Sequence, residues 1–179
     1  MAILGATALA ASAGMVGSAT GHGPVPCPPG QSAGVKCASP NEPGEKKVYV
    51  ITGTNGPDVI VGTSGDDEIH LGHGDDRVSS RGGNDKIVDL GGNDVINAGT
   101  GNDHVAAYQG ADRIIGGPGN DVLEGEAGKD RLSGGSGNDR LAGDEHDDKL
   151  FGGKGRDRLI GGPGGDVLVG GPGKDRQTQ

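Results

Sequence analysis

Residues 116–124 read GGPGNDVLE, residues 134–142 read GGSGNDRLA and residues 161–169 read GGPGGDVLV. The three segments share glycines at their first, second and fourth positions, an aspartate at the sixth and a leucine at the eighth. Their starting positions differ by multiples of nine, so they are copies of one nonapeptide repeat. Glycine that recurs at a fixed period indicates a repetitive solenoid and not a disordered chain.

The aspartate of this repeat recurs every nine residues through fourteen consecutive copies, without an insertion or a deletion. A glycine stands two residues before each aspartate, except in one copy where His146 takes that place. An aliphatic residue stands two residues after each aspartate, except in the last copy, which has Gln177. The fourteen aspartates are Asp58, Asp67, Asp76, Asp85, Asp94, Asp103, Asp112, Asp121, Asp130, Asp139, Asp148, Asp157, Asp166 and Asp175.

The composition excludes several classes of function. Forty glycines and ten prolines stand among 179 residues, and the formal net charge is −9. With one Phe, two Tyr and no Trp, the chain lacks the aromatic side chains for an ordinary core or for stacking nucleic-acid bases. Basic residues are spread singly over an acidic chain, so we expect no nucleic-acid partner. A conventional enzyme domain is not expected either, and we predict no catalysis.

Each repeat divides into a turn and a short strand. The glycines allow the first six residues to form a tight turn whose carbonyl groups point at one spot. The sixth to ninth positions read Asp, variable, aliphatic, variable, which is the alternation of a strand with one face inward. The aspartate and the aliphatic residue are therefore expected on the inner side. The seventh position, which is Lys or Arg in eight of the fourteen repeats, is expected to face outward.

If two repeats make one turn, repeats on the same side are eighteen residues apart. Asp94 then stacks between Asp76 and Asp112, while the aspartates of the other repeats stack on the opposite edge. Successive turns lie about 4.8 Å apart, and a Ca²⁺ ion with oxygen ligands at about 2.4 Å fits between two carboxylates at that separation. Without the ion, neighbouring carboxylates repel by about 1 kcal/mol even in bulk water. We therefore predict that calcium is a folding cofactor.

The repeats resemble the haemolysin-type calcium-binding (RTX) nonapeptides, GGxGxDxUx, and are similar to the β-roll domain of serralysin-like proteases. The resemblance covers about 125 of the 179 residues. It implies an all-β fold, a right-handed parallel β-roll (β-solenoid) with two nonapeptide repeats per turn, and Ca²⁺ held in the loops between successive turns. It also implies that the metal ligands are the fourteen aspartates, from Asp58 to Asp175.

The repeats are not equal as predicted calcium sites. Filling all twelve same-side pairs of aspartates moves the formal charge from −9 to +15, so we expect some sites to stay weak. The best predicted calcium sites are in the repeats whose flanking glycines are intact; these repeats contain Asp121, Asp139, Asp157, Asp166 and Asp175. Five repeats lack the first glycine, which weakens their turns without abolishing ligation; they carry Leu71, Ser80, Asp89, Ala98 and Ala107. In the copy at 143–151, the extra acids are either additional ligands or solvated loop charges; they are Asp144, Glu145 and Asp147.

The chain outside the repeats divides into three segments. Residues 1–19 are apolar and uncharged, and we interpret them as a signal peptide cleaved after Ala19; a membrane anchor and a disordered tail are the alternatives. Residues 20–47 read as a Pro/Gly-rich linker in which Cys27 and Cys37 either form a disulfide or stay free. The β-roll is expected over residues 48–176, with residues 48–51 capping its first turn, and residues 177–179 form a tail.

Two functions follow as hypotheses. The first is a secreted, extracellular β-roll that binds calcium ions, folds on binding them and does not insert stably into a membrane after processing. The alternative is an extracellular structural or assembly solenoid that folds without metal, because outward aliphatic residues such as Val88, Ile115 and Ile160 suit a self-association surface. His70 and His73 are expected to be exposed loop residues and not zinc ligands.

Overall fold

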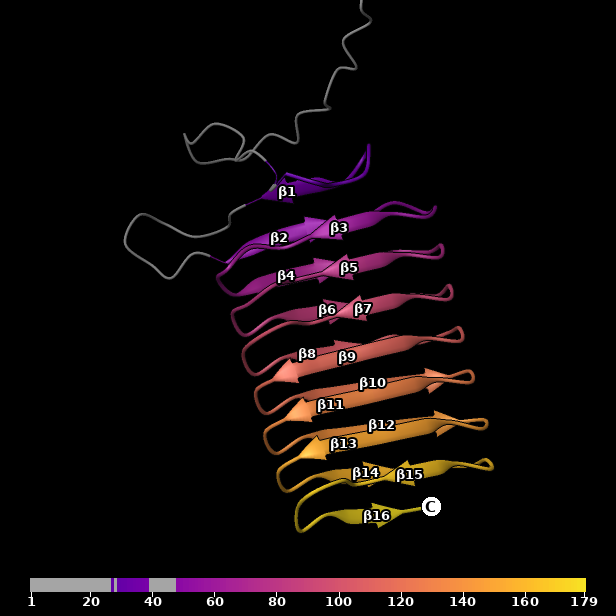
Figure 1. The fold of residues 1–179 in the computed structure, drawn as a ribbon. Coiled ribbons are helices and arrows are strands. Elements are labelled where there is room, and N and C mark those ends of the chain that lie inside the picture. Colours follow the sequence, from indigo (N-terminus) through magenta and orange to yellow (C-terminus); the bar gives the residue numbers. More distant parts are fainter. Residues whose placement is uncertain (1–26, 28, 39–47) are drawn as a thin grey trace, which may run out of the picture.

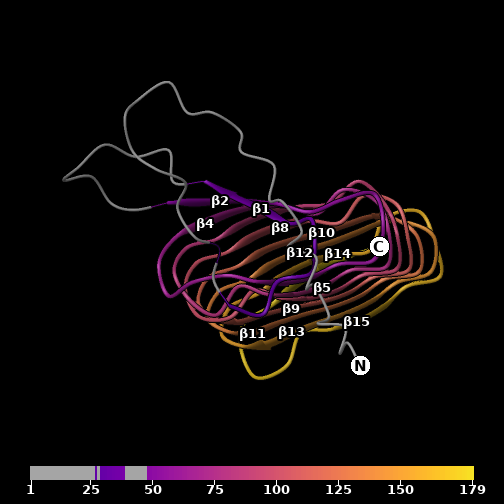
Figure 2. The same ribbon diagram turned by 90° about the horizontal axis from the view of Figure 1, so that it is seen from above.

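The computed structural model describes residues 27, 29–38 and 48–179, and all regular structure within these ranges is β-strand. The chain winds into a flattened coil whose turns stack along one axis (Figure 1). Seen along that axis, the strands lie in two facing layers joined by loops at both edges (Figure 2). Within the described ranges, no helix is long and apolar enough to cross a membrane. The predicted signal peptide at residues 1–19 lies outside the described residues.

The two layers are a nine-stranded and a seven-stranded sheet, and the chain alternates between them. The first sheet contains β1 (Lys36–Ala38), β2 (Tyr49–Thr52), β4 (Asp67–His70), β6 (Lys86–Val88), β8 (His104–Ala106), β10 (Val122–Ala127), β12 (Arg140–Glu145), β14 (Arg158–Ile160) and β16 (Arg176–Thr178). The second contains β3 (Val59–Val61), β5 (Arg77–Ser79), β7 (Val95–Asn97), β9 (Arg113–Pro118), β11 (Arg131–Ser136), β13 (Lys149–Lys154) and β15 (Val167–Val169).

The strand register confirms the prediction of two repeats per turn. Neighbouring strands from β2 to β16 pair in parallel with an offset of eighteen residues, as in the pairs Ile69↔Ile87 and Ile96↔Ile114. The all-β parallel β-roll expected from the repeat is therefore the observed fold. A nine-residue period produces this register because successive repeats alternate between the two sheets.

The core is the aliphatic column of the eighth position, as the alternation predicts. Its members from Ile60 to Leu159 are at most 5% exposed, and they stack from turn to turn between the two sheets. Ile51 lies nine residues before Ile60, the first member of the column. It continues the column and is fully buried. Leu168 in the last repeats is only partly buried against this core.

The first turn is covered by residues 29–38, which lie within the range interpreted from sequence as a linker. Strand β1 pairs antiparallel with β2, with Cys37 opposite Ile51. The Gln31 side chain accepts the Val61 N–H at 2.9 Å and donates to the Val61 carbonyl. Cys27 and Cys37 form a disulfide, so of the two alternatives the paired one is found. The described part of this segment is therefore a cap that covers the edges of β2 and β3.

Candidate metal centre

The aspartates of the repeats form two columns, one at each edge of the roll. The twelve from Asp58 to Asp157 are at most 3% exposed, whereas Asp166 and Asp175 in the last turn are half-buried. The structure brings together every same-side pair that the eighteen-residue spacing predicts, and one column stands at the start of the strands of the nine-stranded sheet, the other at the start of those of the seven-stranded sheet. Inward aspartates without exposed surface lose their contacts with water, so each carboxylate needs partners inside the protein.

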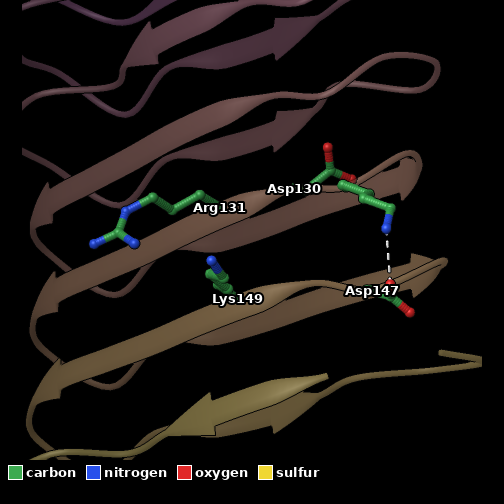
Figure 3. A pocket seen from close by; sticks show the side chains of 5 residues that line it. Asp130, Arg131, Asp147 and Lys149 are labelled. Carbon is green, nitrogen blue, oxygen red and sulfur yellow. Dashed lines mark hydrogen bonds and ion pairs between the residues drawn. The ribbon is translucent and has the colours of Figure 1, made fainter. Parts of the chain in front are cut away.

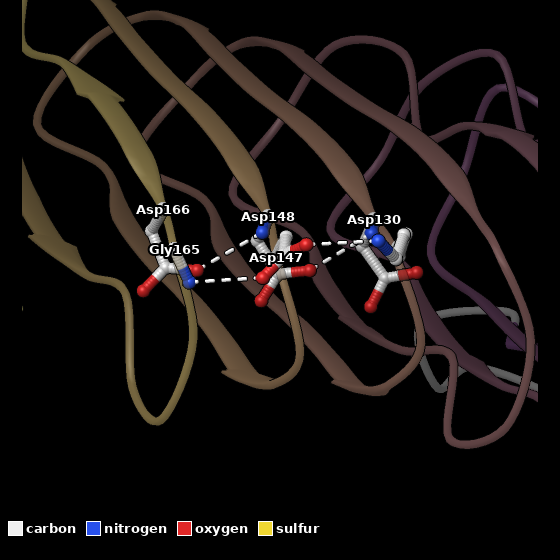
Figure 4. A network of polar contacts seen from close by, with 6 residues as sticks. Asp130, Asp147, Asp148, Gly165 and Asp166 are labelled. Atoms are coloured by element: carbon white, nitrogen blue, oxygen red, sulfur yellow. Dashed lines mark hydrogen bonds and ion pairs between the residues drawn. The ribbon is translucent and has the colours of Figure 1, made fainter.

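One oxygen of each carboxylate has a backbone partner that sequence reasoning did not anticipate. In all twelve same-side pairs, the backbone N–H of one aspartate donates to Oδ1 of the aspartate one turn further on, at 2.7–3.0 Å. Figure 4 shows part of one column, with Asp130, Asp148 and Asp166 joined in this way. These bonds offset part of the repulsion between carboxylates because each Oδ1 faces an N–H dipole.

The other oxygen, Oδ2, is buried without any donor in eleven repeats. These oxygens belong to Asp76, Asp85, Asp94, Asp103, Asp112, Asp121, Asp130, Asp139, Asp148, Asp157 and Asp166. A buried carboxylate oxygen without a partner is costly, and eleven such unpaired oxygens in register are not a local defect. A partner that repeats with the same period would satisfy them.

In three repeats that begin with glycine, the unpaired Oδ2 and a main-chain carbonyl oxygen border a space that a side chain would fill. A Cβ atom added to Gly116, at the first position of its repeat, would meet Asp121 Oδ2 at 2.3 Å and the Gly134 carbonyl oxygen at 2.8 Å. The same two kinds of oxygen bound the space at Gly134 and Gly152. The first glycine of the repeat therefore keeps side-chain atoms out of a position where a carboxylate and a carbonyl oxygen converge.

Burial also changes the acid strength of these carboxyl groups. It raises the pKa of Asp76, Asp85, Asp139 and Asp148 to about 6, and that of Asp103 and Asp112 to about 7. The backbone N–H bonds to Oδ1 oppose this rise, and the neighbouring aspartates of the column add to it. Carboxylates with such raised pKa values favour a proton or a cation over the bare charged state.

The first two repeats differ because threonine follows their first glycine. The backbone N–H of Thr54 donates to Asp58 Oδ2 at 2.7 Å, and its hydroxyl donates to the same oxygen at 3.0 Å. Thr63 makes the equivalent backbone bond to Asp67 Oδ2 at 2.6 Å, and its hydroxyl also contacts that carboxylate. Thr54 and Thr63 therefore satisfy the oxygens that remain unpaired in later repeats, a role that sequence reasoning missed although both threonines stand in the same repeat position.

A second set of side-chain to backbone bonds joins adjacent turns outside the aspartate columns. These bonds involve the fifth position of the repeat, and sequence reasoning missed them too. The side chains of Asn84, Asn102, Asn120 and Asn138 each accept the backbone N–H of the fifth residue one turn further on, at 2.7–2.9 Å. Asp147 accepts the Gly165 N–H in the same way and forms an ion pair with Lys129 at 2.8 Å (Figure 3). The Asn that recurs immediately before the Asp of the repeat is the feature of the sequence that could have indicated these bonds.

Of the extra acids, Asp144 and Glu145 are the last residues of strand β12 and not loop residues; Asp144 is half-buried and Glu145 is exposed. Asp147, an alternative ligand from sequence, is exposed, and its bonds to Lys129 and Gly165 lower its pKa. His146 adopts the glycine-like φ of 86° that its position requires. His73 is exposed, as expected. The expectation of an exposed loop residue is wrong for His70, which is the last residue of strand β4, is half-buried and lies beside Glu68, with 3.4 Å between Nε2 and Oε1. Within the described ranges, no group of three potential metal ligands contains a histidine.

The donor set fits calcium. It consists only of carboxylate and carbonyl oxygens, which hard cations prefer, and nitrogen or sulfur ligands of a zinc site take no part in it. Asp121, Asp139 and the other residues with an unpaired Oδ2 would hold the ions, and each ion would supply positive charge between two turns. The repeated unpaired Oδ2 and, in repeats that begin with glycine, the open space beside it are the observations that support this fit.

The chain matches a known family. A model described as "RTX calcium-binding nonapeptide repeat (4 copies)" matches residues 52–87, 80–112, 88–123, 107–141 and 142–176. A search of curated proteins returned no match to the chain. The matched segments together span residues 52–176, the same stretch that forms the stacked turns.

Proposed function

Because the chain belongs to the family of RTX calcium-binding nonapeptide repeat proteins, we propose that it is an exported β-roll that folds on binding Ca²⁺ and catalyses no reaction. The observation that carries the proposal is the register of unpaired Oδ2 atoms along both edges of the roll. Calcium is the cofactor of this repeat. Ions bound between successive turns would recur with the same period as the unpaired Oδ2 atoms. The fourteen aspartates from Asp58 to Asp175 are the proposed ligands.

Folding on calcium binding follows from the same contacts. In the calcium-free chain, closing the roll buries eleven carboxylate oxygens that have no donor. That cost falls on the folded state alone, because the unfolded chain leaves the same groups in water. Each ion bound between two turns removes it and links those turns, so binding and folding are coupled.

Calcium titration of the chelator-treated protein, followed by circular dichroism, tests this proposal. We expect the β signal to rise between micromolar and about 10 mM calcium, the range that covers extracellular sites. Magnesium at the same ionic strength should produce a much smaller rise, because it demands tighter octahedral geometry. A roll that is already complete in excess EDTA and unchanged by calcium would contradict the coupling of folding to the metal.

A pair of variants identifies the ligands. Replacing Asp103 and Asp121 together by asparagine removes two adjacent carboxylate charges from one column, and the calcium midpoint should rise. Asp75→Asn is the control, since Asp75 is exposed and its Oδ1 accepts the Asn93 N–H, a bond that asparagine can keep. Equal midpoints for the two proteins would count against the columns as the calcium sites.

Export is supported by two independent features. Residues 1–19 are apolar and carry no Lys, Arg, Asp or Glu, as in a secretory signal. The Cys27–Cys37 disulfide favours an oxidising, extracellular compartment. Expression of the full chain with detection of the product in the medium, and mass determination of its N-terminus, tests this point. Retention of the intact chain inside the cell would contradict it.

A metal-independent assembly role is the second candidate. The bonds from backbone N–H groups to Oδ1 join every pair of stacked turns without a metal, and valines such as Val59 and Val167 expose 46% of their surface on the outside of the strands. Light scattering with and without EDTA separates the two functions. Assembly that ignores the chelator favours this candidate, and loss of particles in EDTA favours the first.

A further inference from the structure

One carboxylate inside the roll belongs to neither aspartate column. Asp89 occupies the first position of the repeat that contains Asp94, where nine of the fourteen repeats have glycine. Its side chain is completely buried, and neither of its oxygens has a hydrogen-bond partner. The other four non-glycine residues at this position are also fully buried; they are Leu71, Ser80, Ala98 and Ala107. The first position therefore points into the roll, and Asp89 brings a carboxylate to the interior.

Asp89 points at two carboxylates that already need a partner. Asp76 and Asp94 are stacked neighbours in one column, and the Oδ2 atom of each has no donor. One oxygen of Asp76, one of Asp89 and one of Asp94 lie within 4.8 Å of one another. Within the described ranges, this is the one set of three potential ligands that comes so close. Each of the three buried acids thus brings one carboxylate oxygen to a single spot, and four of their six oxygens have no hydrogen-bond partner.

Ser80 shows which side-chain chemistry suits this position. It occupies the first position in the opposite column, and its hydroxyl donates to the Ala98 carbonyl one turn further on. The surroundings of the first position are therefore acceptors, namely the carboxylate of the same repeat and the carbonyl of the next turn. Serine supplies a proton to such a site, but an ionised aspartate adds one more acceptor. Burial, with Asp94 and Asp112 nearby, raises the pKa of Asp89 to about 8.

We propose that Asp76, Asp89 and Asp94 bind one calcium ion with three carboxylates, and that this ion is the first that the roll takes up. The inference rests on the proposed calcium-binding function and goes beyond it by ranking one site above the others. Three negative charges attract a divalent cation more strongly than the two of an ordinary same-side pair, and ligand charge is a main determinant of calcium affinity. A repeat that departs from the glycine pattern at its first position therefore holds the tightest site.

Competition with a chromophoric calcium chelator measures the first ion bound. In the full-length protein, we expect one ion to bind in a distinct tight phase before the remaining ions. Asp89→Ala should weaken that phase by about 10- to 100-fold, and Asp89→Asn should weaken it less because one oxygen ligand remains. Alanine fits this position, since Ala98 and Ala107 are buried at the same place in neighbouring repeats. Circular dichroism in saturating calcium verifies that each variant forms the roll.

Asp75→Asn is the charge-matched control, because it removes one negative charge from an exposed position next to Asp76 and should keep the tight phase. A tight phase that survives Asp89→Ala unchanged would overturn the proposal and would mean that Asp89 is a buried acid that keeps its proton. A wild-type protein that binds several ions without a distinct first phase would also overturn it, while leaving calcium binding intact. Failure of the wild-type protein to bind any calcium would instead refute the proposed function itself.

Discussion

At the scale of single residues, the structure depends on places where one turn touches the next. The fourth glycine of a repeat is such a place: a Cβ atom added to Gly119 would lie 1.6 Å from the Gly101 carbonyl oxygen. Gly119 also has a φ of 152°, which side chains rarely adopt. The equivalent glycine of the first repeat, Gly56, has no atom within 4 Å of the added Cβ, because no repeat stacks on that side.

This contrast predicts different costs for the same substitution. Gly119→Ala should destabilise the calcium-loaded roll by about 3 kcal/mol, since both the backbone strain and the overlap must be relieved. Gly56→Ala should change stability by no more than about 0.5 kcal/mol. Thermal unfolding followed by circular dichroism at saturating calcium compares the two variants. Equal melting temperatures would show that the turns do not stack as closely as described.

The same scale separates what the sequence can predict from what it cannot. The inward direction of Asp94 and Ile96 follows from the two-residue alternation of a strand, and both are buried as predicted. The roles of Thr54 and Thr63 depend on bonds within one turn, which a nine-residue period does not specify. Asp89 was interpreted only as a weaker turn, although the apolar residues at the same position in nearby repeats already indicated that this position faces the core.

At the scale of elements, strand β2 and its covering segment explain how the roll begins. Tyr49 stands where an aspartate would complete the register, and it pairs with Asp67 as a preceding repeat would. Strand β1 then runs antiparallel to β2, so the free edge of the first sheet is covered. Sequence reasoning predicted that residues 48–51 cap the first turn but missed β1, because three residues in a Pro/Gly-rich stretch have no detectable periodicity.

The disulfide holds this cap, and its removal should have a local effect. Replacing Cys27 and Cys37 by serine opens a loop of ten residues, for which about 3 kcal/mol is the expected limit of stabilisation. Hydrogen exchange should become faster in β1 and β2, while the strands from β6 onward keep their protection because each turn contacts mainly its neighbours. Gln31→Ala, which removes the bonds to Val61 but keeps the disulfide, serves as the comparison. Loss of protection along the entire roll would contradict a local cap.

At the scale of the whole molecule, the two aspartate columns give stability an unusual dependence on pH. The folded-state pKa values of about 6 and about 7 in these columns lie above the unfolded value of about 3.9, so the folded chain binds more protons between these limits. In that window, the calcium-free roll gains stability as the pH falls. The destabilising charge is fully present above pH 8 and is absent below about pH 4.

Calcium should reverse this trend. With ions bound, the aspartates are needed in their charged form, and protons compete for the same oxygens as the pH falls through 7 and 6. At pH 5, 6, 7 and 8, the β signal by circular dichroism in EDTA should therefore rise toward low pH, while the denaturant midpoint in saturating calcium should fall toward low pH. Slopes of the same sign under both conditions would contradict a role for these carboxylates in binding the ion.

The rungs formed by each aspartate N–H and the next Oδ1 join a turn only to the turns on either side of it. A force that pulls on the last strand therefore breaks the bonds between two adjacent turns at a time, and not those of the whole structure. Each release would free eighteen residues, or about 60 Å of extended chain, in a single step. Under tension, the roll would therefore lengthen in equal steps. Bound calcium would determine the force that each step requires.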